Sequence, residues 1–355
     1  MSMGTLSDLA KKVKGQLVGL DESFSAVSTD TRNIQKGQLF IALKGPNFDG
    51  CEFVQDAADL GAAGALVDRV VNVNITQVQV SDTRQALAEF ASTWRAQFKI
   101  PVVAVTGSNG KTTIKQLLAQ ILAKRGPILS TRGNLNNDIG LPLTLLDINK
   151  KHWAAVVEMG ANHHGEIGYL TDLALPTVGI ISNARAAHLE GFGSIEGVAR
   201  AKGELFARMP NSSVAIVNAD DKYCDYWHEV SKGKRVVTFG NSEQADVRVH
   251  DISQEIVGNQ PRLTFDITHA GKTCSARIHF AGAHNAYNAA AAVAASLQLG
   301  LTLEQACDGL SGTKPVASRM NIRESVSGAT IVDDSYNANP ASLKAGVEFL
   351  TSLGG

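Results

Sequence analysis

The sequence lacks several features that mark membrane, secreted and nucleic-acid-binding proteins. No apolar run approaches the roughly 18 residues of a membrane span, and no basic-then-apolar leader opens the chain. The formal net charge is -1, so no excess of basic residues supplies a broad surface for nucleic acid. We therefore expect a cytoplasmic protein whose partners include neither membrane nor nucleic acid.

Cysteine is scarce, and its spacing argues against two further classes of protein. The chain has 4 cysteines and no C-x-x-C pair, so we expect neither a zinc cluster nor a disulfide framework. We interpret most of these cysteines as buried, reduced thiols. They are Cys51, Cys224, Cys274 and Cys307. Internal repeats and low-complexity tracts are absent too.

What the chain does contain is typical of an ordinary soluble protein. Its 355 residues are 44% hydrophobic and 19% charged, and the length suggests two or three domains, each with an adequate core. Alternating strand and helix patterns predict the α/β class. We expect an N-terminal α/β domain over 1–84, a central P-loop domain with a mostly parallel sheet over 85–314, and the start of a third domain over 315–355.

One segment, VVAVTGSNGKTT at Val102–Thr113, predicts a nucleoside triphosphate site. A buried strand runs into a glycine turn, and helical spacing follows, so backbone N–H groups and a helix dipole point at one place. We expect Lys111 to reach the β- and γ-phosphates of ATP and the Thr112 hydroxyl to bind Mg²⁺. The general pattern has glycine where Val105 stands, so we interpret the loop as a shorter variant. The expected nucleotide-binding residues of the loop are Thr106, Gly107, Ser108, Asn109, Gly110, Lys111, Thr112 and Thr113.

Two polar residues follow buried strands, where ligands gather in open parallel sheets. Glu158 ends an apolar stretch and either reaches Mg²⁺, directly or through water, or faces solvent. His188 lies in a glycine-bounded loop after the strand expected at Val178–Ile181. Active-site groups concentrate in such loops, although a single histidine is more often structural.

Other polar groups have two interpretations each. Ser28, Thr29 and Arg32 form either a solvated turn, which the pattern favours, or a pocket for a nucleotide-sugar head group with Arg32 on an anion. Asn134 and Asn137 suit sugar or amide ligands, and equally suit plain turns.

Two helices carry further candidates. Asn285 and Asn288 share one face of a helix's first turn, where an amide can pair with adenine. Lys202 lies on a helix that we expect to begin after a Ser194 cap and to run to about residue 209, and pattern alone predicts that it is solvated. Between about 245 and 280 the alternation predicts antiparallel strands. We also expect an exposed apolar patch around Phe349 and Leu350.

Taken together, these motifs resemble the Mur ligase superfamily, the ATP-dependent amide-bond formers of peptidoglycan precursor synthesis. The shared features are TGSNGKTT, the strand ending at Glu158, His188, Lys202 within AKGE, His284-Asn285-x-x-Asn288, and Arg319 with Asp334. The stretches GNLNNDIGLP (133–142), EMGANHHGEI (158–167), AAHLEGFGS (186–194) and DDSYNANP (333–340) are similar to the branch that joins D-Ala-D-Ala to UDP-N-acetylmuramoyl-tripeptide. The resemblance covers the whole chain.

The resemblance implies a role for each candidate. The N-terminal domain would bind the UDP group near Ser28, Thr29 and Arg32, and Asn134 and Asn137 would face that substrate. Thr112 and Glu158 would hold one Mg²⁺, and His188 a second, with Lys202 as a carbamate that also ligates metal. Asn285 and Asn288 would hold adenine, and Arg319 and Asp334 would close over ATP. Lys111, His188 and Lys202 are then the expected catalytic residues, in a chain that we expect to be a monomer.

The chain departs from the family pattern at three points. Cys51 stands where relatives have histidine, and Ser318 where glycine is usual. Only the first strand and helix of the Rossmann-like third domain are expected. The alternatives are therefore a ligase for another amino acid, a folate polyglutamate synthase, which the Ser28–Arg32 unit and DDSYNANP argue against, and a UDP-sugar and ATP-binding module without catalysis.

Overall fold

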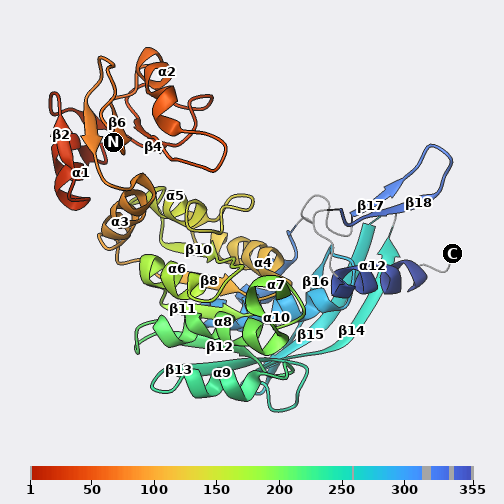
Figure 1. The fold of residues 1–355 in the computed structure, drawn as a ribbon. Helices are drawn as coiled ribbons and strands as arrows, with labels where there is room; N and C mark the ends of the chain where they lie inside the picture. Colours follow the sequence, from red (N-terminus) through yellow and green to blue (C-terminus); the bar gives the residue numbers. More distant parts are fainter. Residues whose placement is uncertain (1, 258–259, 314–320, 336–339, 353–355) are drawn as a thin grey trace. The chain divides into compact units, whose positions relative to one another are not determined.

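The computed structural model describes residues 2–257, 260–313, 321–335 and 340–352, and Figure 1 shows its fold. Packing divides the chain into two compact units. Unit 1 is Met1–Lys99 with Gly133–Asn149, and unit 2 is Ile100–Arg132 with Lys150–Gly355. This division differs from the boundary expected at residue 84. The helix over Thr83–Arg95 packs with unit 1, and the chain returns to unit 1 for the asparagine-rich loop.

Unit 1 is built on a small mixed sheet. Its strands are β1 (Gly4–Thr5), β2 (Gln16–Val18), β3 (Ser23–Phe24), β4 (Val27–Ser28), β5 (Leu39–Ile41), β6 (Gly64–Val67) and β7 (Gln77–Gln79). Its helices are α1 (Leu6–Lys12), the 3-10 helix η1 (Gly50–Phe53), α2 (Val54–Asp59), α3 (Thr83–Arg95) and α5 (Gly140–Leu146). Five of these strands form the mixed sheet, in the order β2-β7-β6-β5-β4, antiparallel at β2 and parallel elsewhere, and β1 and β3 form a separate antiparallel pair. Every residue of β5 and β6 is buried, as expected for parallel strands covered on both faces.

Unit 2 contains a nine-stranded sheet and a separate hairpin. Its strands are β8 (Val102–Thr106), β9 (Ile128–Ser130), β10 (Ala154–Glu158), β11 (Val178–Ile181), β12 (Val214–Asn218), β13 (Arg235–Gly240), β14 (Val247–Val257), β15 (Gln260–His269), β16 (Lys272–Ile278), β17 (Asn321–Glu324) and β18 (Thr330–Asp333). Its helices are α4 (Lys111–Ala123), α6 (Glu166–Ala174), α7 (Leu189–Phe192), α8 (Ile195–Arg208), α9 (Cys224–Val230), α10 (His284–Gln298), α11 (Leu303–Leu310) and α12 (Pro340–Ser352).

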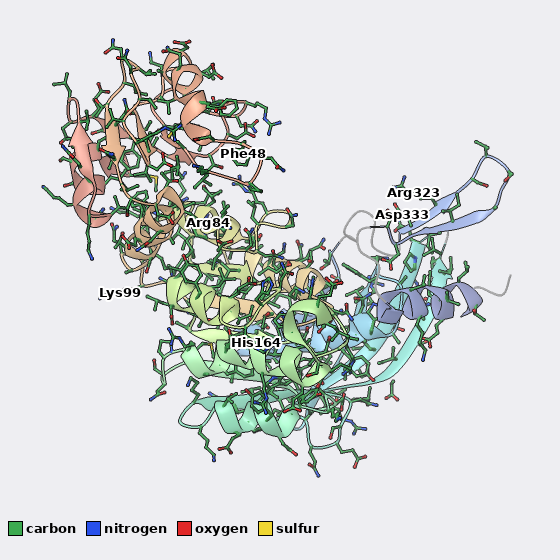
Figure 2. The ribbon with its side chains drawn as sticks, viewed as in Figure 1. Phe48, Arg84, Lys99, His164, Arg323 and Asp333 are labelled. Atoms are coloured by element: carbon green, nitrogen blue, oxygen red, sulfur yellow. The ribbon has the colours of Figure 1, made fainter. Side chains whose placement is uncertain are left out.

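The large sheet has the order β16-β15-β14-β13-β12-β11-β8-β10-β9. Neighbouring strands are parallel from β9 to β14 and antiparallel from β14 to β16, which confirms the expected antiparallel segment. The hairpin of β17 and β18 forms its own two-stranded sheet. Figure 2 labels Arg323 and Asp333, which face each other across this hairpin as an ion pair of 3.1 Å.

Helices cover both faces of the sheet in unit 2. Helices α4, α10 and α11 pack together, and their core takes alternating strand residues such as Val103 and Val105. Because successive strand residues point to opposite faces, the second group, α6, α8 and α9, covers the other face. The middle of α10 is a run of fully buried alanines, whose small side chains let the helix lie close to the sheet and to α4.

Most expected elements are present, and the structure adds several that were not predicted. The expected Ser194 cap is confirmed: its side chain accepts from the Gly197 N–H at 3.0 Å, and α8 begins at the next residue. The unpredicted elements include β7, β9, α5, α7, α9 and β17. Over the described part of the chain, none of the helices combines the length and the apolar character needed to span a bilayer.

Candidate active site

The strand order of unit 2 places several polar loops in one row. Strand β8 lies between β10 and β11, so the chain crosses over β8 on its way from β10 to β11. In an open parallel sheet, a crossing of this kind leaves a crevice at the carboxyl ends of the strands. The loop after β8, the carboxylate ending β10 and the segment after β11 therefore converge there.

The loop after β8 has the expected strand, glycine turn and helix. Gly107 and Gly110 have φ of 141° and 84°, and α4 begins directly after Gly110. A Cβ at Gly107 would lie 1.9 Å from Ser182 Oγ, and one at Gly110 would lie 2.4 Å from Asn288 Oδ1. Both positions therefore need glycine for backbone conformation and for space.

The loop is tied to the segment after β11. Asn109 accepts from the Ser182 hydroxyl at 2.6 Å and from the Asn183 amide at 3.1 Å. The Ser108 hydroxyl donates to the Arg185 carbonyl at 3.0 Å and accepts from the Arg185 N–H at 2.9 Å. At the start of the loop, the buried Thr106 hydroxyl donates to the Met159 carbonyl. Hydrogen bonds within the protein thus hold the loop in shape.

The two residues predicted for phosphate and metal have defined partners. Lys111 Nζ donates to the carbonyls of Gly107 at 2.8 Å and Ser108 at 3.2 Å, so its ammonium group lies folded over the loop. The Thr112 hydroxyl donates to Glu158 Oε2 at 3.0 Å. Glu158 is buried, which excludes the solvent-facing interpretation. The next residue of the loop, Thr113, is also buried.

Glu158 also has a cationic neighbour that the sequence analysis missed. Lys115 is buried, and its Nζ lies 3.5 Å from Glu158 Oε2 and donates to the Thr131 carbonyl at 2.8 Å. Lys115 lies one helical turn after Lys111, a spacing that would have placed it on the same face of α4. The carboxylate is therefore partly neutralised from within the fold.

Lys202 is buried, contrary to the prediction from pattern alone. Only 2% of the residue is exposed, and Nζ lies 5.2 Å from the centroid of the Phe192 ring. Burial, and then the charge of Lys111, lower the pKa of Lys202 to about 7. The neutral amine is therefore well populated at neutral pH.

His188 lies near this amine. It has a left-handed backbone with φ of 52° and is the residue directly before the short helix α7. Burial, then the charges of Lys202 and Lys111, lower the pKa of His188. His164, labelled in Figure 2, meets Phe192 edge-to-face with centroids 5.6 Å apart. Phe192 therefore contacts both the His164 ring and the Lys202 amine.

The two asparagines of α10 are buried and bonded to each other. Asn288 donates to Asn285 Oδ1 at 2.9 Å, and Asn285 donates to the Ala281 carbonyl at 2.7 Å. Asn288 lines a cavity of about 1130 Å³ beside the phosphate loop. The hydrogen bond from Asn288 to Asn285 holds the Asn288 side chain in place. The cavity is lined, among others, by Asn109, Gly110, Ser182, Asn183, Asn218, Asp220, Asn241, Ser242, Tyr287 and Asn288.

In unit 1, the structure places the predicted substrate residues in turns. Ser28 accepts from the Asp30 N–H and donates to the Asp30 carbonyl, and Thr29 lies between them. Arg32 is exposed and pairs with the Asp30 carboxylate at 2.7 Å, a contact that lowers the pKa of Asp30. This local geometry supports the turn interpretation, while Arg32 stays accessible to an anion.

The asparagine loop of unit 1 also has a local structural role. Asn137 Oδ1 accepts from the N–H groups of Ile139 and Gly140, which begin α5. Asn134 is exposed, and its carbonyl accepts from the Asn136 N–H at 2.7 Å. The plain-turn interpretation is therefore sufficient for Asn137 in this structure.

Two predicted residues lie at the end of the chain. Arg319 falls outside the described residues. Asp334 follows β18 and is half-buried. Phe349 is buried against Ala281, so the expectation that it is exposed was wrong, whereas Leu350 is 49% exposed.

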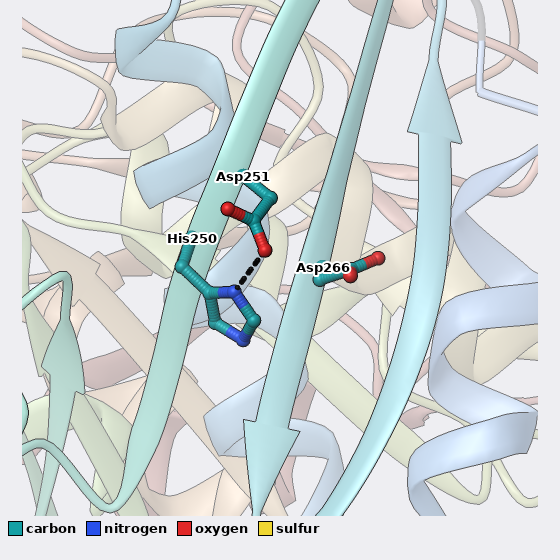
Figure 3. A group of neighbouring side chains, drawn as sticks. All are labelled: His250, Asp251 and Asp266. Carbon is teal, nitrogen blue, oxygen red and sulfur yellow. Dashed lines mark hydrogen bonds and ion pairs between the residues drawn. The ribbon is translucent and has the colours of Figure 1, made fainter.

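A second polar cluster lies away from this crevice, on β14 and β15 (Figure 3). His250 Nδ1 contacts Asp251 Oδ2 at 2.9 Å, and Asp266 offers a further oxygen nearby. Within the described residues its groups also have neighbours: His250 Nε2 contacts Thr268, and Asp266 accepts from Ser275. The three residues of this cluster are not among those that line the nucleotide cavity, whereas Arg248 and Gln254 of the same strand β14 are.

Comparison with known proteins gives a consistent result. Residues 105–296 match the Mur ligase middle domain, and residues 23–95 match the Mur ligase family, catalytic domain. The chain is 40% identical to the UDP-N-acetylmuramoyl-tripeptide--D-alanyl-D-alanine ligase of Escherichia coli (strain K12), over 99% of this chain and 77% of that protein.

Two solved structures extend the similarity to the fold. The crystal structure of MurF from Acinetobacter baumannii superimposes with a TM-score of 0.92 at 36% identity, over 99% of this chain and 77% of that one. MurF ligase from Thermotoga maritima, solved in complex with ADP, gives a TM-score of 0.79 at 29% identity, over 92% and 74%.

Proposed function

The chain belongs to the Mur ligase family, and from this premise we infer that it joins D-Ala-D-Ala to UDP-N-acetylmuramoyl-tripeptide with ATP. The product is the UDP-N-acetylmuramoyl-pentapeptide of peptidoglycan synthesis. The observation that carries this inference is the 40% identity to a ligase of that name over 99% of the chain. The glycine turn, Lys111 and the adjoining cavity provide the nucleotide site that such a ligase needs.

The reaction brings two anions together, so its barrier is largely electrostatic. The carboxylate of the acceptor attacks the γ-phosphate of ATP, giving an acyl phosphate and ADP. The amine of D-Ala-D-Ala then attacks the acyl carbon and releases phosphate. We assign Lys111 to the β- and γ-phosphates: its Nζ lies over the phosphate loop and donates to the carbonyls of Gly107 and Ser108, and phosphate oxygens there would accept stronger, charge-assisted hydrogen bonds.

We propose that Thr112 and Glu158 hold one Mg²⁺. A hydroxyl and a carboxylate oxygen 3.0 Å apart beside a phosphate loop match the oxygen ligands that Mg²⁺ prefers. When bound, Mg²⁺ would offset charge on the phosphates. Lys115 limits the net negative charge at Glu158, so ATP oxygens must complete the site.

The second proposed metal site does not fit the chain with Lys202 unmodified, because an ammonium group repels a cation. We propose that the neutral Lys202 amine adds CO₂ to give a carbamate and a proton. Its lowered pKa of about 7 supplies the neutral amine that this addition requires. The carbamate, with His188, would then offer a metal-ligating anion where the fold now places a cation.

We propose that unit 1 binds the UDP part of the acceptor, with Ser28, Thr29, Arg32 and Asn134 as candidate contacts. Cys51 is compatible with this role, since its thiol donates to Asp68 at 3.2 Å inside the unit, and burial raises its pKa. We further propose that Asn288 contacts the adenine end of ATP and that Asp334 lies on the hinge side. We also propose that the enzyme is monomeric and cytoplasmic.

The test is phosphate release by the 355-residue chain with Mg-ATP and UDP-N-acetylmuramoyl-tripeptide, with and without D-Ala-D-Ala. Release that depends on D-Ala-D-Ala, with a pentapeptide mass, is expected. Lys111→Ala should reduce release by at least about 100-fold, because it removes the cation at the transferred phosphate. Binding of ATP and of UDP-N-acetylmuramoyl-tripeptide without any release of phosphate would instead indicate a binding module. That result would contradict the proposed ligase activity of this chain.

A further inference from the structure

Four loops stand side by side at the carboxyl edge of the large sheet. Strands β8, β11, β12 and β13 are consecutive neighbours, and the register aligns Thr106, Ile181, Val217 and Thr238. Adjacent strands lie about 4.8 Å apart, so the row from β8 to β13 spans about 14 Å. The loop after β12, Asn218-Ala219-Asp220-Asp221, therefore lies between the segment at 182–185 and the turn at 240–243.

Asp221 links the loop after β12 to the phosphate loop through the segment after β11. Its side chain is fully buried, and Oδ2 accepts from the Ala184 N–H at 3.1 Å and from Arg185 Nη1 at 3.0 Å. Arg185 in turn exchanges two hydrogen bonds with the Ser108 hydroxyl. Two consecutive links thus join the Asp221 carboxylate to the phosphate loop.

Asp220 connects the same loop to the turn after β13. Its two oxygens accept from the N–H groups of Asn241 at 2.6 Å and Ser242 at 3.0 Å. A Cβ at Gly240 would lie 2.5 Å from Asp220 Oδ2, so glycine is needed for this close approach. Asn241 and Ser242 line the nucleotide cavity, and they follow β13, which lies three strands from β8 and its phosphate loop.

We propose that Asp221 and Asp220 are positioning residues that hold opposite ends of the nucleotide cavity. Asp221 fixes the phosphate end through Ala184 and Arg185. Asp220 fixes the side where the base lies, through the turn at Asn241 and Ser242. This inference rests on the proposed nucleotide site and extends it, because sequence analysis assigned neither aspartate a role.

The experiment compares the affinity of the chain for ADP, which carries a base, with its affinity for pyrophosphate, which has none. Binding of Mg-ADP and of Mg-pyrophosphate to the full chain is measured by calorimetry for the wild type, Asp221→Asn and Asp220→Asn. Asp221→Asn should weaken both probes by a similar factor, about tenfold, since a charged hydrogen bond is lost at the phosphate end. Asp220→Asn should weaken ADP by about tenfold and leave pyrophosphate unchanged.

Asp225→Asn is the matched control, since Asp225 is an exposed carboxylate on the neighbouring helix α9. It should change neither affinity. If Asp221→Asn does not fold, Ser108→Ala tests the same link, because it removes the hydroxyl that joins the loop to Arg185; it should weaken both probes.

Two results separate this inference from the proposed function. A wild-type chain that binds neither probe would refute the nucleotide site itself. A wild-type chain that binds both probes, with folded Asp221→Asn or Asp220→Asn variants that keep wild-type affinity, or with an Asp220→Asn variant that loses both probes equally, would overturn the positioning roles and leave the site intact.

Discussion

Lys202 carries a charge that the fold disfavours, and this has a measurable consequence for stability. Its pKa falls from 10.5 in the unfolded chain to about 7 in the folded one. Between these values the unfolded chain binds the proton that the folded chain has released. The free energy of unfolding contributed by Lys202 therefore rises with pH across this window, by at most about 1.4 kcal/mol per pH unit.

We predict that Lys202→Met removes this pH dependence. In CO₂-free buffer the variant should be more stable than the wild type at pH 7 and below, and the difference should shrink as the pH rises toward about 10. Chemical denaturation at a series of pH values measures it. Parallel curves for the two proteins would show that the lysine titrates normally in the folded chain.

Glu158 and Lys115 form a buried pair whose members depend on each other. Glu158→Gln removes the negative charge that lies 3.5 Å from the buried Lys115 ammonium, so we expect a loss of about 3 kcal/mol in the free energy of unfolding. The double variant Glu158→Gln/Lys115→Met should recover much of that loss, because it removes both charges. Denaturant unfolding of the four proteins completes the cycle, and a single variant as stable as the wild type would contradict the pairing.

At the scale of elements, the N-termini of α4 and α10 meet at one glycine. Gly110→Ala adds a Cβ 2.4 Å from Asn288 Oδ1 and also strains a φ of 84°. Gly165 is a matched control, since it has a φ of 86°, precedes α6, and has open space around its Cβ position. We expect Gly165→Ala to lose about 1 kcal/mol of stability and Gly110→Ala about 3 kcal/mol.

Thermal unfolding compares the two glycine variants directly. Adding Asn288→Ala to Gly110→Ala should return its stability toward that of Gly165→Ala, because the obstructing amide is then absent. Equal losses in both single variants would mean that the backbone relaxes away from Asn288 and that the two helices are not tightly coupled.

Hydrophobic pattern was sufficient to predict most of these elements, and tertiary contacts explain the misses. The strand before Gly107 and the Ser194 cap follow from local sequence, and both are confirmed. The same reasoning gave the wrong result for Lys202, because the burial of a lysine on a helix depends on tertiary packing, here against Phe192. Family resemblance, unlike pattern, singled out that residue.

Other residues of the site needed the three-dimensional order of the strands. Asp221 lies 110 positions after Lys111 in the chain, and only the neighbouring positions of β8, β11 and β12 bring their loops together. Local sequence also could not assign residues 133–149 to unit 1, because that depends on α5 packing against α3.

At the scale of the whole molecule, the monomer stays a prediction. Helix α12 exposes Leu343, Val347 and Leu350, which are 66%, 54% and 49% accessible and share one helical face. Sedimentation equilibrium should give the mass of one 355-residue chain across a range of concentrations. If a dimer forms instead, Leu350→Glu should dissociate it, and a dimer that survives the change would place the contact elsewhere.

If Lys202 forms the proposed carbamate, its burial beside Phe192 should make the activity of the chain depend on its recent exposure to carbon dioxide. Carbamate formation needs dissolved carbon dioxide and the neutral amine together, and lower pH favours the first while higher pH favours the second. Burial that promotes the neutral amine also slows the passage of small molecules to and from it. Ligase activity should therefore depend on how long a preparation has been kept in degassed buffer, and bicarbonate should restore it gradually.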